Sequence, residues 1–160
     1  HDALPISPPT LITRSLAEIE AFQKKHKEII IKPLYEYGGH GILKVTSADE
    51  LKNLKLDFKQ HFIAQKCLDI STGDKRIFFI NGEIAGAFVR RPAEGSYIAN
   101  IAAGGSIHKT EITKREHEFA KVLKPLLVEN GIYICGIDVI DNHVTEINIT
   151  SSVGLSKMEE

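Results

Sequence analysis

"GIDVIDNHVTEINITS", residues 136–151, decides the fold, because it predicts a β-hairpin with one apolar face and one polar face. A turn of two residues would pair Asp138 with Thr145. A turn of three residues, 141–143, would pair Asp138 with Glu146 instead. Only the second register gathers all the apolar side chains on one face, and these are Ile137, Val139, Ile147 and Ile149. We therefore predict the three-residue turn.

The polar face of this hairpin predicts a cation site. Asp138, Glu146 and Asn148 would converge there, and successive residues of one face are two apart in a strand. Carboxylate and amide oxygens are the ligands that Mg²⁺ prefers, together with water and substrate phosphates. A solvated polar sheet face is the simpler interpretation when these three residues are taken alone. The glycine-rich stretch at residues 29–45 favours the cation site.

"IIIKPLYEYGGHGILKV", residues 29–45, reads as a buried strand, a glycine-rich turn and a second strand. Lys32 ends the first strand, where a charged group is costly unless it meets a negative partner. A phosphate group would be such a partner, whereas a lysine that snorkels to solvent is the alternative. The lysine precedes the glycines, so the stretch is not a Walker-type phosphate loop. We expect a hairpin whose glycine loop covers phosphate groups.

The rest of the chain predicts antiparallel hairpins mixed with helices. Helices are expected over residues 15–26, 47–54 and 113–131, and capping boxes are expected at Ser15 with Glu18 and at Thr113 with Glu116. The clearest hairpin has Asn81-Gly82 as a two-residue turn, which pairs residue n with residue 163−n. This order of elements argues for an α+β fold and against a doubly wound parallel sheet.

That hairpin carries arginines at its open end. The predicted register places Asp74 and Arg76 near Val89 and Ala87, close to Arg90. Arginines gathered at one end of a sheet suit bidentate recognition of carboxylate or phosphate. Surface pairing with neighbouring acidic residues is the alternative interpretation. The small-residue loop "ANIAAGG" that follows would allow a ligand to approach the backbone closely.

Composition excludes some classes of partner. The chain has 160 residues and a net charge of −1, which gives no reason to expect nucleic acid or a membrane surface as partner. Its two cysteines, Cys67 and Cys135, have no metal-type spacing and predict buried thiols in a reducing compartment. Residues 1–7, "HDALPIS", begin without methionine and are set apart as a candidate non-native scar, with further sequence expected upstream.

Together these motifs resemble the ATP-grasp domain of the prokaryotic glutathione synthetase family. The resemblance runs from about Pro8 to the last residue and rests on "PPTLITR", "IIIKPLYEYGGHGI", "GDKRIFFINGE", "RRPAEGSYIANIAAGG" and "GIDVIDNHVTEINITSSVG". It implies two small α+β lobes with antiparallel sheets that enclose an ATP cleft, residues 8–66 with the glycine-rich loop and residues 67–160 with the Mg²⁺ hairpin. The family's N-terminal substrate domain is then expected upstream, and the last helix is expected to be cut short.

The resemblance also implies an activity. Members of this family join γ-glutamylcysteine to glycine and convert ATP to ADP and phosphate. The dipeptide carboxylate takes the γ-phosphoryl group to give an acyl phosphate, and the glycine amine then displaces phosphate. A cytoplasmic enzyme that is a homo-oligomer at full length, without nucleic-acid or membrane partners, is the corresponding expectation.

The matching motifs imply roles for individual residues of this chain. Contacts to ATP would come from Lys32, Tyr37, Gly38, Gly39, His40, Gly41 and Asp74, and the adenine pocket from Gln65, Lys66, Cys67 and Leu68. Mg²⁺ or Mn²⁺ would be held by Asp138, Glu146 and Asn148. Arg76, Arg90 and Asn100 would orient the phosphate and the peptide carboxylate, with Ser151, Gly104 and Gly105 near the substrates.

Two positions depart from the family pattern, and three alternatives stay open. Ile98 stands where some members carry a substrate-binding arginine, and Ser152 where proline is common. A different ATP-grasp ligase would use the same lysine, loop and cation hairpin. A non-catalytic nucleotide-binding module and an α+β domain with a plain polar sheet face are the remaining alternatives.

Overall fold

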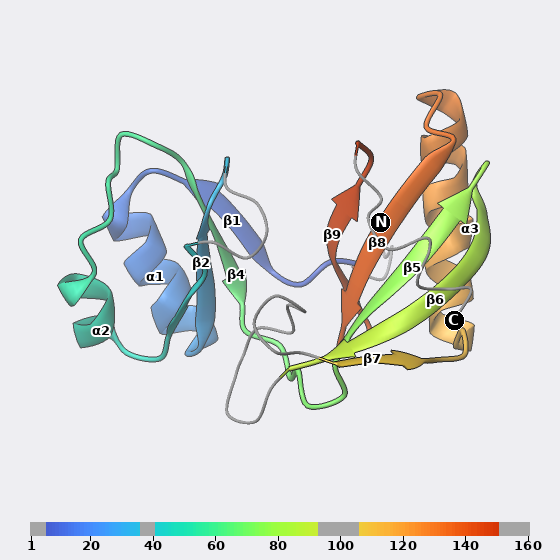
Figure 1. Ribbon diagram of the computed structural model, residues 1–160. Helices are drawn as coiled ribbons and strands as arrows, with labels where there is room; N and C mark the ends of the chain where they lie inside the picture. Colours follow the sequence, from blue (N-terminus) through green and yellow to red (C-terminus); the bar gives the residue numbers. More distant parts are fainter. Residues whose placement is uncertain (1–5, 36–40, 93–105, 151–160) are drawn as a thin grey trace. The chain divides into compact units, whose positions relative to one another are not determined.

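The computed structural model describes residues 6–35, 41–92 and 106–150 (Figure 1). These residues form two compact units. The smaller unit is Pro8–Leu68, and the larger unit consists of the described residues of His1–Ser7 and Asp69–Glu160. Each unit has its own antiparallel sheet and its own hydrophobic core.

The smaller unit is a four-stranded antiparallel sheet with two helices. Its strand order is β1 (Thr10–Thr13), β4 (Phe62–Lys66), β2 (Ile29–Pro33) and β3 (Leu43–Val45). Helices α1 (Leu16–His26) and α2 (Ala48–Asn53) pack on one face, where alternate strand residues are buried. This core consists of Ile19, Ile29, Ile31, Val45, Leu51, Phe62 and Ala64. The predicted pairing of the strands on either side of the glycine loop is confirmed, because β2 pairs with β3.

The start of α1 differs in one detail from the prediction. Ser15 caps the helix by accepting the Glu18 amide, as expected. The Glu18 carboxylate, however, accepts the Thr13 hydroxyl instead of the Ser15 amide, which itself donates to Thr13 Oγ1 at 3.0 Å. The predicted capping box at Ser15 is therefore wrong in its second half, because the threonine hydroxyl stands between its two partners.

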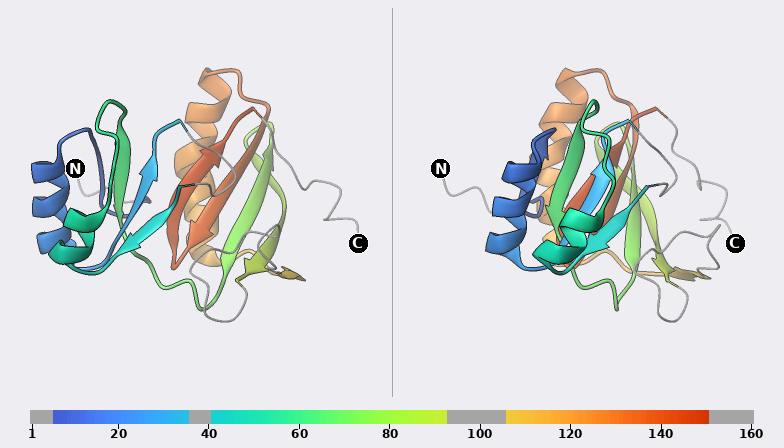
Figure 2. Two further views of the ribbon diagram at one scale, coloured as in Figure 1. Left: turned by 60° about the vertical axis from the view of Figure 1, so that its left-hand side comes forward. Right: turned by 90° about the vertical axis from the view of Figure 1, so that its left-hand side faces the viewer.

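The larger unit is a five-stranded antiparallel sheet covered on one face by one helix (Figure 2). Its strand order is β7 (Ser106–Lys109), β6 (Glu83–Arg91), β5 (Asp74–Ile80), β8 (Ile134–Ile140) and β9 (His143–Asn148). Helix α3 (Lys114–Glu129) begins with the predicted capping box of Thr113 and Glu116, which is confirmed. The Glu116 carboxylate also pairs with Lys75 Nζ at 2.9 Å, which fastens the start of α3 to β5.

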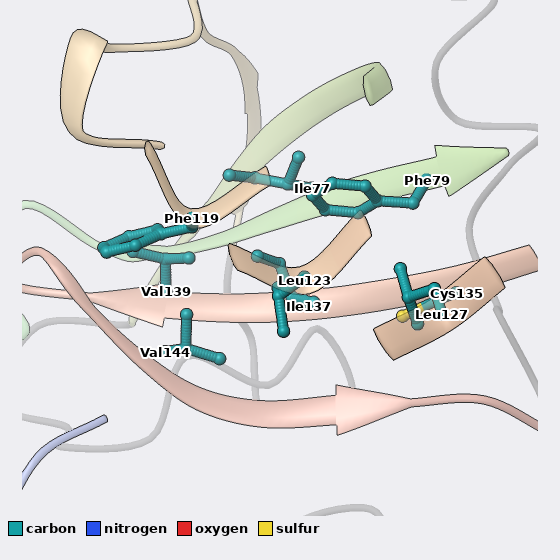
Figure 3. Packing of buried hydrophobic residues seen from close by; sticks show 9 residues of the cluster. All are labelled: Ile77, Phe79, Phe119, Leu123, Leu127, Cys135, Ile137, Val139 and Val144. Carbon is teal, nitrogen blue, oxygen red and sulfur yellow. The ribbon is translucent and has the colours of Figure 1, made fainter. Parts of the chain in front are cut away.

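The core of this unit lies between α3 and every second residue of the central strands (Figure 3). It consists of Ile77, Phe79, Phe119, Leu123, Leu127, Cys135, Ile137, Val139 and Val144. Ile6 packs against this cluster, and its backbone carbonyl accepts the Val144 amide at 2.5 Å. The α3 side of the sheet is therefore apolar, and the opposite side carries polar side chains together with the buried rings of Phe78 and Phe88.

A bulge corrects the register predicted for the β5–β6 hairpin. The Asn81-Gly82 turn has two residues, as predicted, and both have positive φ. The register then shifts between Phe78 and Phe79, so that Asp74 pairs with Arg90 and Arg76 with Phe88. The predicted neighbours Val89 and Ala87 are each wrong by one residue, because a bulge inserts one extra β6 residue. The shift puts Arg90 on the same face as Asp74 and Arg76.

A second bulge, in the 136–151 hairpin, makes its turn shorter than predicted. Asp138 pairs with Glu146 as predicted, but the turn holds only Asp141 and Asn142, with φ of 44° and 58°. The three-residue turn is therefore wrong: the register shifts between Asp138 and Val139, and one extra β9 residue restores the pairing. Short polar side chains tolerate the left-handed conformation that such a two-residue turn requires.

Two isoleucines predicted for the apolar face are about half exposed. Ile147 pairs with Ile137 but is 45% exposed, and Ile149 is 52% exposed. The strand β9 is an edge strand, so one side of Ile147 has no neighbouring strand. Val144 packs into the core in their place, because the bulge returns it to the α3 side.

Candidate cation and phosphate site

The face of the larger sheet opposite α3 carries a cluster of charged side chains. Asp74 and Arg76 are two apart in β5, and their cross-strand partners are Arg90 in β6 and Asp138 in β8. Directly paired residues of neighbouring strands project from the same face, as do residues two apart in one strand. All four side chains therefore lie on the side that α3 leaves uncovered.

Arg76 and Asp138 form the centre of the cluster. Arg76 Nε donates to Asp138 Oδ1 at 2.6 Å, and Nη2 donates to Oδ2 at 2.5 Å. The two residues are 8% and 5% exposed, so this two-bond fork is buried. Burial by itself would lower the pKa of Arg76, but the hydrogen bonds to Asp138 and the charges of Asp138, Asp74 and Glu146 raise it overall. The guanidinium is therefore a fixed positive charge.

Arg90 joins a second carboxylate to this pair. Its Nη2 atom lies 2.5 Å from Asp74 Oδ2 and 3.0 Å from Asp138 Oδ1. Burial and the nearby negative charge of Asp138 raise the pKa of Asp74 to about 7, although both arginines act in the opposite direction. One nitrogen of Arg90 thus serves two acidic side chains.

This sharing leaves two buried polar atoms without a partner. Among the described residues, neither Asp74 Oδ1 nor Arg90 Nε has a hydrogen bond. A buried polar group without a partner costs about 1–3 kcal/mol. Such groups are uncommon in folded proteins, so a pair of them in one cluster calls for a functional explanation.

Two glycines make room for the cluster. A Cβ on Gly136 would lie 3.3 Å from Arg76 Cδ, so the bare backbone of β8 lets the arginine lie flat against it. Gly73 has a φ of +96°, and a Cβ there would lie 2.7 Å from the Arg90 carbonyl oxygen. Sequence reasoning did not select Gly136, although a glycine inside a strand often marks a close approach of another group.

The candidate ligands fit a hard cation by their chemistry. Asp138 pairs with Glu146, and Gly136 pairs with Asn148, so all three oxygen-bearing side chains lie on the uncovered face. A carboxylate can accept about four contacts through its lone pairs. The contacts of Arg76 and Arg90 use both Asp138 oxygens, with two nitrogens at Oδ1 and one at Oδ2. Oδ2 therefore keeps room for one further ligand bond.

The other two donors are more open than Asp138. Glu146 is exposed, and the Asn148 amide satisfies both neighbours when its nitrogen donates to Glu146 Oε1 at 2.9 Å and its oxygen accepts Arg76 Nη2 at 3.2 Å. The described part of the chain holds no cluster of three His, Cys, Asp or Glu side chains suited to a metal. A cation here would thus need the amide oxygen of Asn148 as its third protein ligand.

The smaller unit presents its own polar face, on the side of the sheet away from its helices. Lys32 pairs with Ile63, and Gln65 pairs with Ile30, so all lie opposite the core residues. Within the described ranges the Lys32 ammonium has no hydrogen bond or ion pair, whereas Gln65 Nε2 donates to Thr10 Oγ1 at 3.0 Å. Lys32 is therefore available to an external anion.

The segment after Gln65 is held by backbone bonds. The Lys66 amide donates to the Pro9 carbonyl at 3.0 Å, and the Cys67 amide to the Glu28 carbonyl at 2.9 Å. Cys67 is partly buried and burial raises the pKa of its thiol, and Cys135 is fully buried; both are free. Several predicted site residues lie outside the described residues, namely Tyr37, Gly38, Gly39, His40, Asn100, Gly104, Gly105 and Ser151.

Comparison with solved structures defines the class of this fold as ATP-grasp. D-cycloserine synthetase DcsG is similar with a TM-score of 0.72 at 13% identity, over 94% of this chain and 59% of that one. The ATP-grasp ligase PsnB, solved with a minimal precursor, Mg and ADP, is similar with a TM-score of 0.66 at 20% identity, over 98% of this chain and 49% of that one. The predicted α+β ATP-grasp fold is confirmed.

Sequence comparison then gives the family. The profile described as "Prokaryotic glutathione synthetase, ATP-grasp domain" matches residues 3–160, and the chain belongs to this family. It is 40% identical to the glutathione synthetase of Bradyrhizobium diazoefficiens over 94% of this chain and 42% identical to that of Mesorhizobium japonicum over 96%. The chain spans about half the length of these curated relatives, 50% and 51% respectively.

Proposed function

We propose that the chain is the ATP-grasp part of an ATP-dependent carboxylate–amine ligase that joins γ-glutamylcysteine to glycine. Membership of the family supports the activity, and its relatives are glutathione synthetases. The observation that carries the proposal is the cluster of Arg76, Arg90 and Asp138 on the uncovered face of the larger sheet. Fixed positive charges next to an oxygen-rich cation site are what phosphoryl transfer requires.

The reaction would need no protein nucleophile. A carboxylate oxygen of γ-glutamylcysteine attacks the γ-phosphorus of ATP, the bond to ADP breaks, and an acyl phosphate forms. The glycine amine then attacks the acyl carbon, a C–N bond forms, phosphate leaves, and the amine releases a proton. Several negative charges meet in the first step, so positioning and charge neutralisation supply most of the rate enhancement.

Charged residues of this chain would supply that neutralisation. Lys32, without a partner among the described residues, would bind the ATP phosphates, while Arg76 and Arg90 would orient the transferred phosphoryl group and the peptide carboxylate. The position of Arg76 needs little reorganisation, because Asp138 already holds its guanidinium group in a two-bond fork. The loop that contains Gly41 would exclude water from the acyl phosphate.

Mg²⁺ or Mn²⁺ would be held by Asp138, Glu146 and Asn148. Such a cation would supply positive charge to offset the negative charge that develops on the phosphate during transfer. Gln65 to Leu68 would line the adenine pocket, and Asp74 would lie close to the bound nucleotide. Asn100, Gly104, Gly105 and Ser151 would complete the substrate contacts.

The full-length enzyme is part of the same proposal. We infer a cytoplasmic homo-oligomer from the family, and the two free cysteines accord with a reducing compartment. None of the helices in the described ranges is long and apolar enough to cross a bilayer. A different ATP-grasp ligase is the alternative, because the same lysine and cation ligands would serve another acid–amine pair.

Phosphate release with defined substrates tests this proposal. The chain would replace the corresponding half of the Mesorhizobium japonicum relative, because it spans about half of that protein. We expect ATP-dependent phosphate release only when γ-glutamylcysteine and glycine are both present. Glu146→Ala should lower the rate by about 10²-fold or more, whereas Glu111→Ala, which removes an exposed carboxylate of the same unit, should not change it. Release with another acid–amine pair alone, or full turnover by Glu146→Ala, would contradict the assignment.

A further inference from the structure

The contact between Arg90 and Asp74 is an incomplete version of the fork that Arg76 makes with Asp138. Arg76 uses Nε and Nη2 to reach both oxygens of its carboxylate. Arg90 reaches Asp74 through Nη2 and Oδ2 only. Within the part of the chain that the structure describes, Arg90 Nε and Asp74 Oδ1 are buried without a partner, and they are the donor and the acceptor that the missing bond would join. The side chains are thus one hydrogen bond short of a closed fork.

The contact of Arg90 with Asp138 explains why the second bond between Arg90 and Asp74 is missing. Arg90 Nη2 lies 3.0 Å from Asp138 Oδ1 while it bonds Asp74, so one nitrogen is divided between two carboxylates. A guanidinium is planar and rigid, and its edge can align with only one carboxylate at a time. As long as Arg90 keeps its contact with Asp138, the second bond to Asp74 stays unmade.

A divalent cation at Asp138 would change this balance. Two positive charges beside Oδ2 would repel the Arg90 guanidinium and compete with it for the negative charge of Asp138. Asp74 offers Arg90 a complete two-bond alternative a short movement away, in a buried setting where charge-assisted bonds are strong. The cation and the Arg90–Asp138 contact are therefore thermodynamically linked.

We infer that Asp74 is a positioning residue for Arg90. When a divalent cation binds Asp138, Arg90 leaves Asp138 and forms a closed two-bond fork with Asp74. The inference rests on the proposed function only through the cation site at Asp138, Glu146 and Asn148. It gives Asp74 a role through Arg90 in place of a direct contact with nucleotide. Arg90 would then have two positions, one shared with Asp138 and one closed on Asp74.

Three variants separate this role from a general effect of charge. Asp74→Asn keeps the size of the side chain but offers one oxygen, so the fork cannot close and Arg90 stays on Asp138. Arg90→Gln removes the competing guanidinium. Asp141→Asn removes a carboxylate in the β8–β9 turn that has no contact with Arg90, and asparagine suits its left-handed conformation. Unfolding curves for each variant would establish that it is folded.

The experiment is titration of the chain alone with Mn²⁺, with the free ion measured by electron paramagnetic resonance. We expect Asp74→Asn to weaken Mn²⁺ binding by roughly three- to tenfold and Arg90→Gln to tighten it, magnitudes typical of coupled sites. In the Arg90→Gln background, Asp74→Asn should change the affinity by less than about twofold. Asp141→Asn should have a similarly small effect.

A structural readout accompanies the affinity. The NMR resonance of the Arg90 Nε–H group can be identified by its loss in Arg90→Gln. Its chemical shift should change on addition of Mg²⁺, because the hydrogen bond to Asp74 forms. In Asp74→Asn the same signal should not move. This readout reports the position of the guanidinium and does not depend on turnover.

Several results would overturn the inference. Equal weakening by Asp74→Asn in both backgrounds, or equal weakening by Asp141→Asn, would show that only charge matters. Absence of Mn²⁺ binding by the wild-type chain would also refute it. Since no nucleotide or peptide is present, a failed ligase assay with intact coupling would refute the proposed function alone. Ligase activity without coupling would refute only the role of Asp74.

Discussion

The guanidinium of Arg76 closes a two-bond fork on Asp138, a residue 62 positions away in the chain, with bonds of 2.6 and 2.5 Å. The two strands that carry these residues are adjacent and antiparallel, and the residues are directly paired. The fork is buried on the face that α3 does not cover. Four predictions follow from the cluster around it and from the polar face of the smaller unit.

Asp138→Ala should destabilise the chain strongly. Removing one partner of a buried ion pair leaves the other charge unpaired, at a typical cost of about 3–5 kcal/mol. Here Arg76 would lose both of its hydrogen bonds to Asp138, and Arg90 would lose one contact. Urea unfolding of wild type and variant gives the difference. Glu111→Ala, at an exposed position, should stay within about 0.5 kcal/mol of wild type, and a similar small loss for Asp138→Ala would contradict this account.

Stability should depend on pH through Asp74. The pKa of this carboxyl is raised to about 7 from an ordinary value of 3.8, so the folded state binds the proton more tightly than the unfolded chain does. The resulting stabilisation is fully present below about pH 4, is lost as pH rises to about 7, and is constant above that. The free energy of unfolding of Asp74→Asn, relative to that of wild type, should therefore increase between about pH 4 and pH 7. A difference that does not change across this window would show that the carboxyl titrates normally.

Gly73→Ala should cost more than Gly131→Ala. Both glycines have positive φ, of 96° and 67°, so both substitutions strain the backbone. A Cβ at Gly131 meets nothing within 4 Å, whereas one at Gly73 lies 2.7 Å from the Arg90 carbonyl oxygen. We expect about 1 kcal/mol for Gly131→Ala and a further 1–3 kcal/mol or so for Gly73→Ala from overpacking. Equal midpoints in thermal unfolding would rule out the close approach at Gly73.

Lys32→Ala should weaken nucleotide binding without loss of stability. The ammonium group has no ion-pair partner within the described ranges, so folding does not depend on its charge. Calorimetric titration with ATP and Mg²⁺ should show a loss of about tenfold or more, since each tenfold corresponds to about 1.4 kcal/mol. Lys44→Ala is the matched control: Lys44 lies on the same face but is paired with Glu28 at 2.8 Å. Equal losses for both variants would mean that only net charge matters.

Local signals in the sequence predicted much of the fold. The Asn81-Gly82 turn and the capping box at Thr113 each depend on a few neighbouring residues, and the structure confirms both. The pairing of Asp138 with Glu146 was predicted from the alternation of apolar residues and is also confirmed.

The bulges could not be predicted in the same way. A bulge is selected by how the whole sheet packs against α3 and leaves no strong local pattern. The pairing of Asp74 with Arg90 depends on the first bulge, so sequence reasoning placed Asp74 one residue out of register and missed its ion pair. The second bulge produces the pairing of Asp138 with Glu146, which the prediction had explained by a three-residue turn. Both misses concern the polar cluster, where tertiary packing outweighs local preference.

Isotope transfer tests the central claim most directly. In the hybrid with the Mesorhizobium japonicum relative, γ-glutamylcysteine labelled with ¹⁸O in its cysteinyl carboxylate would be converted in the presence of ATP and glycine. If the carboxylate is activated as an acyl phosphate, one ¹⁸O atom passes into each phosphate released and glutathione forms. Phosphate without ¹⁸O, or glutathione that retains both labelled oxygens, would contradict the account.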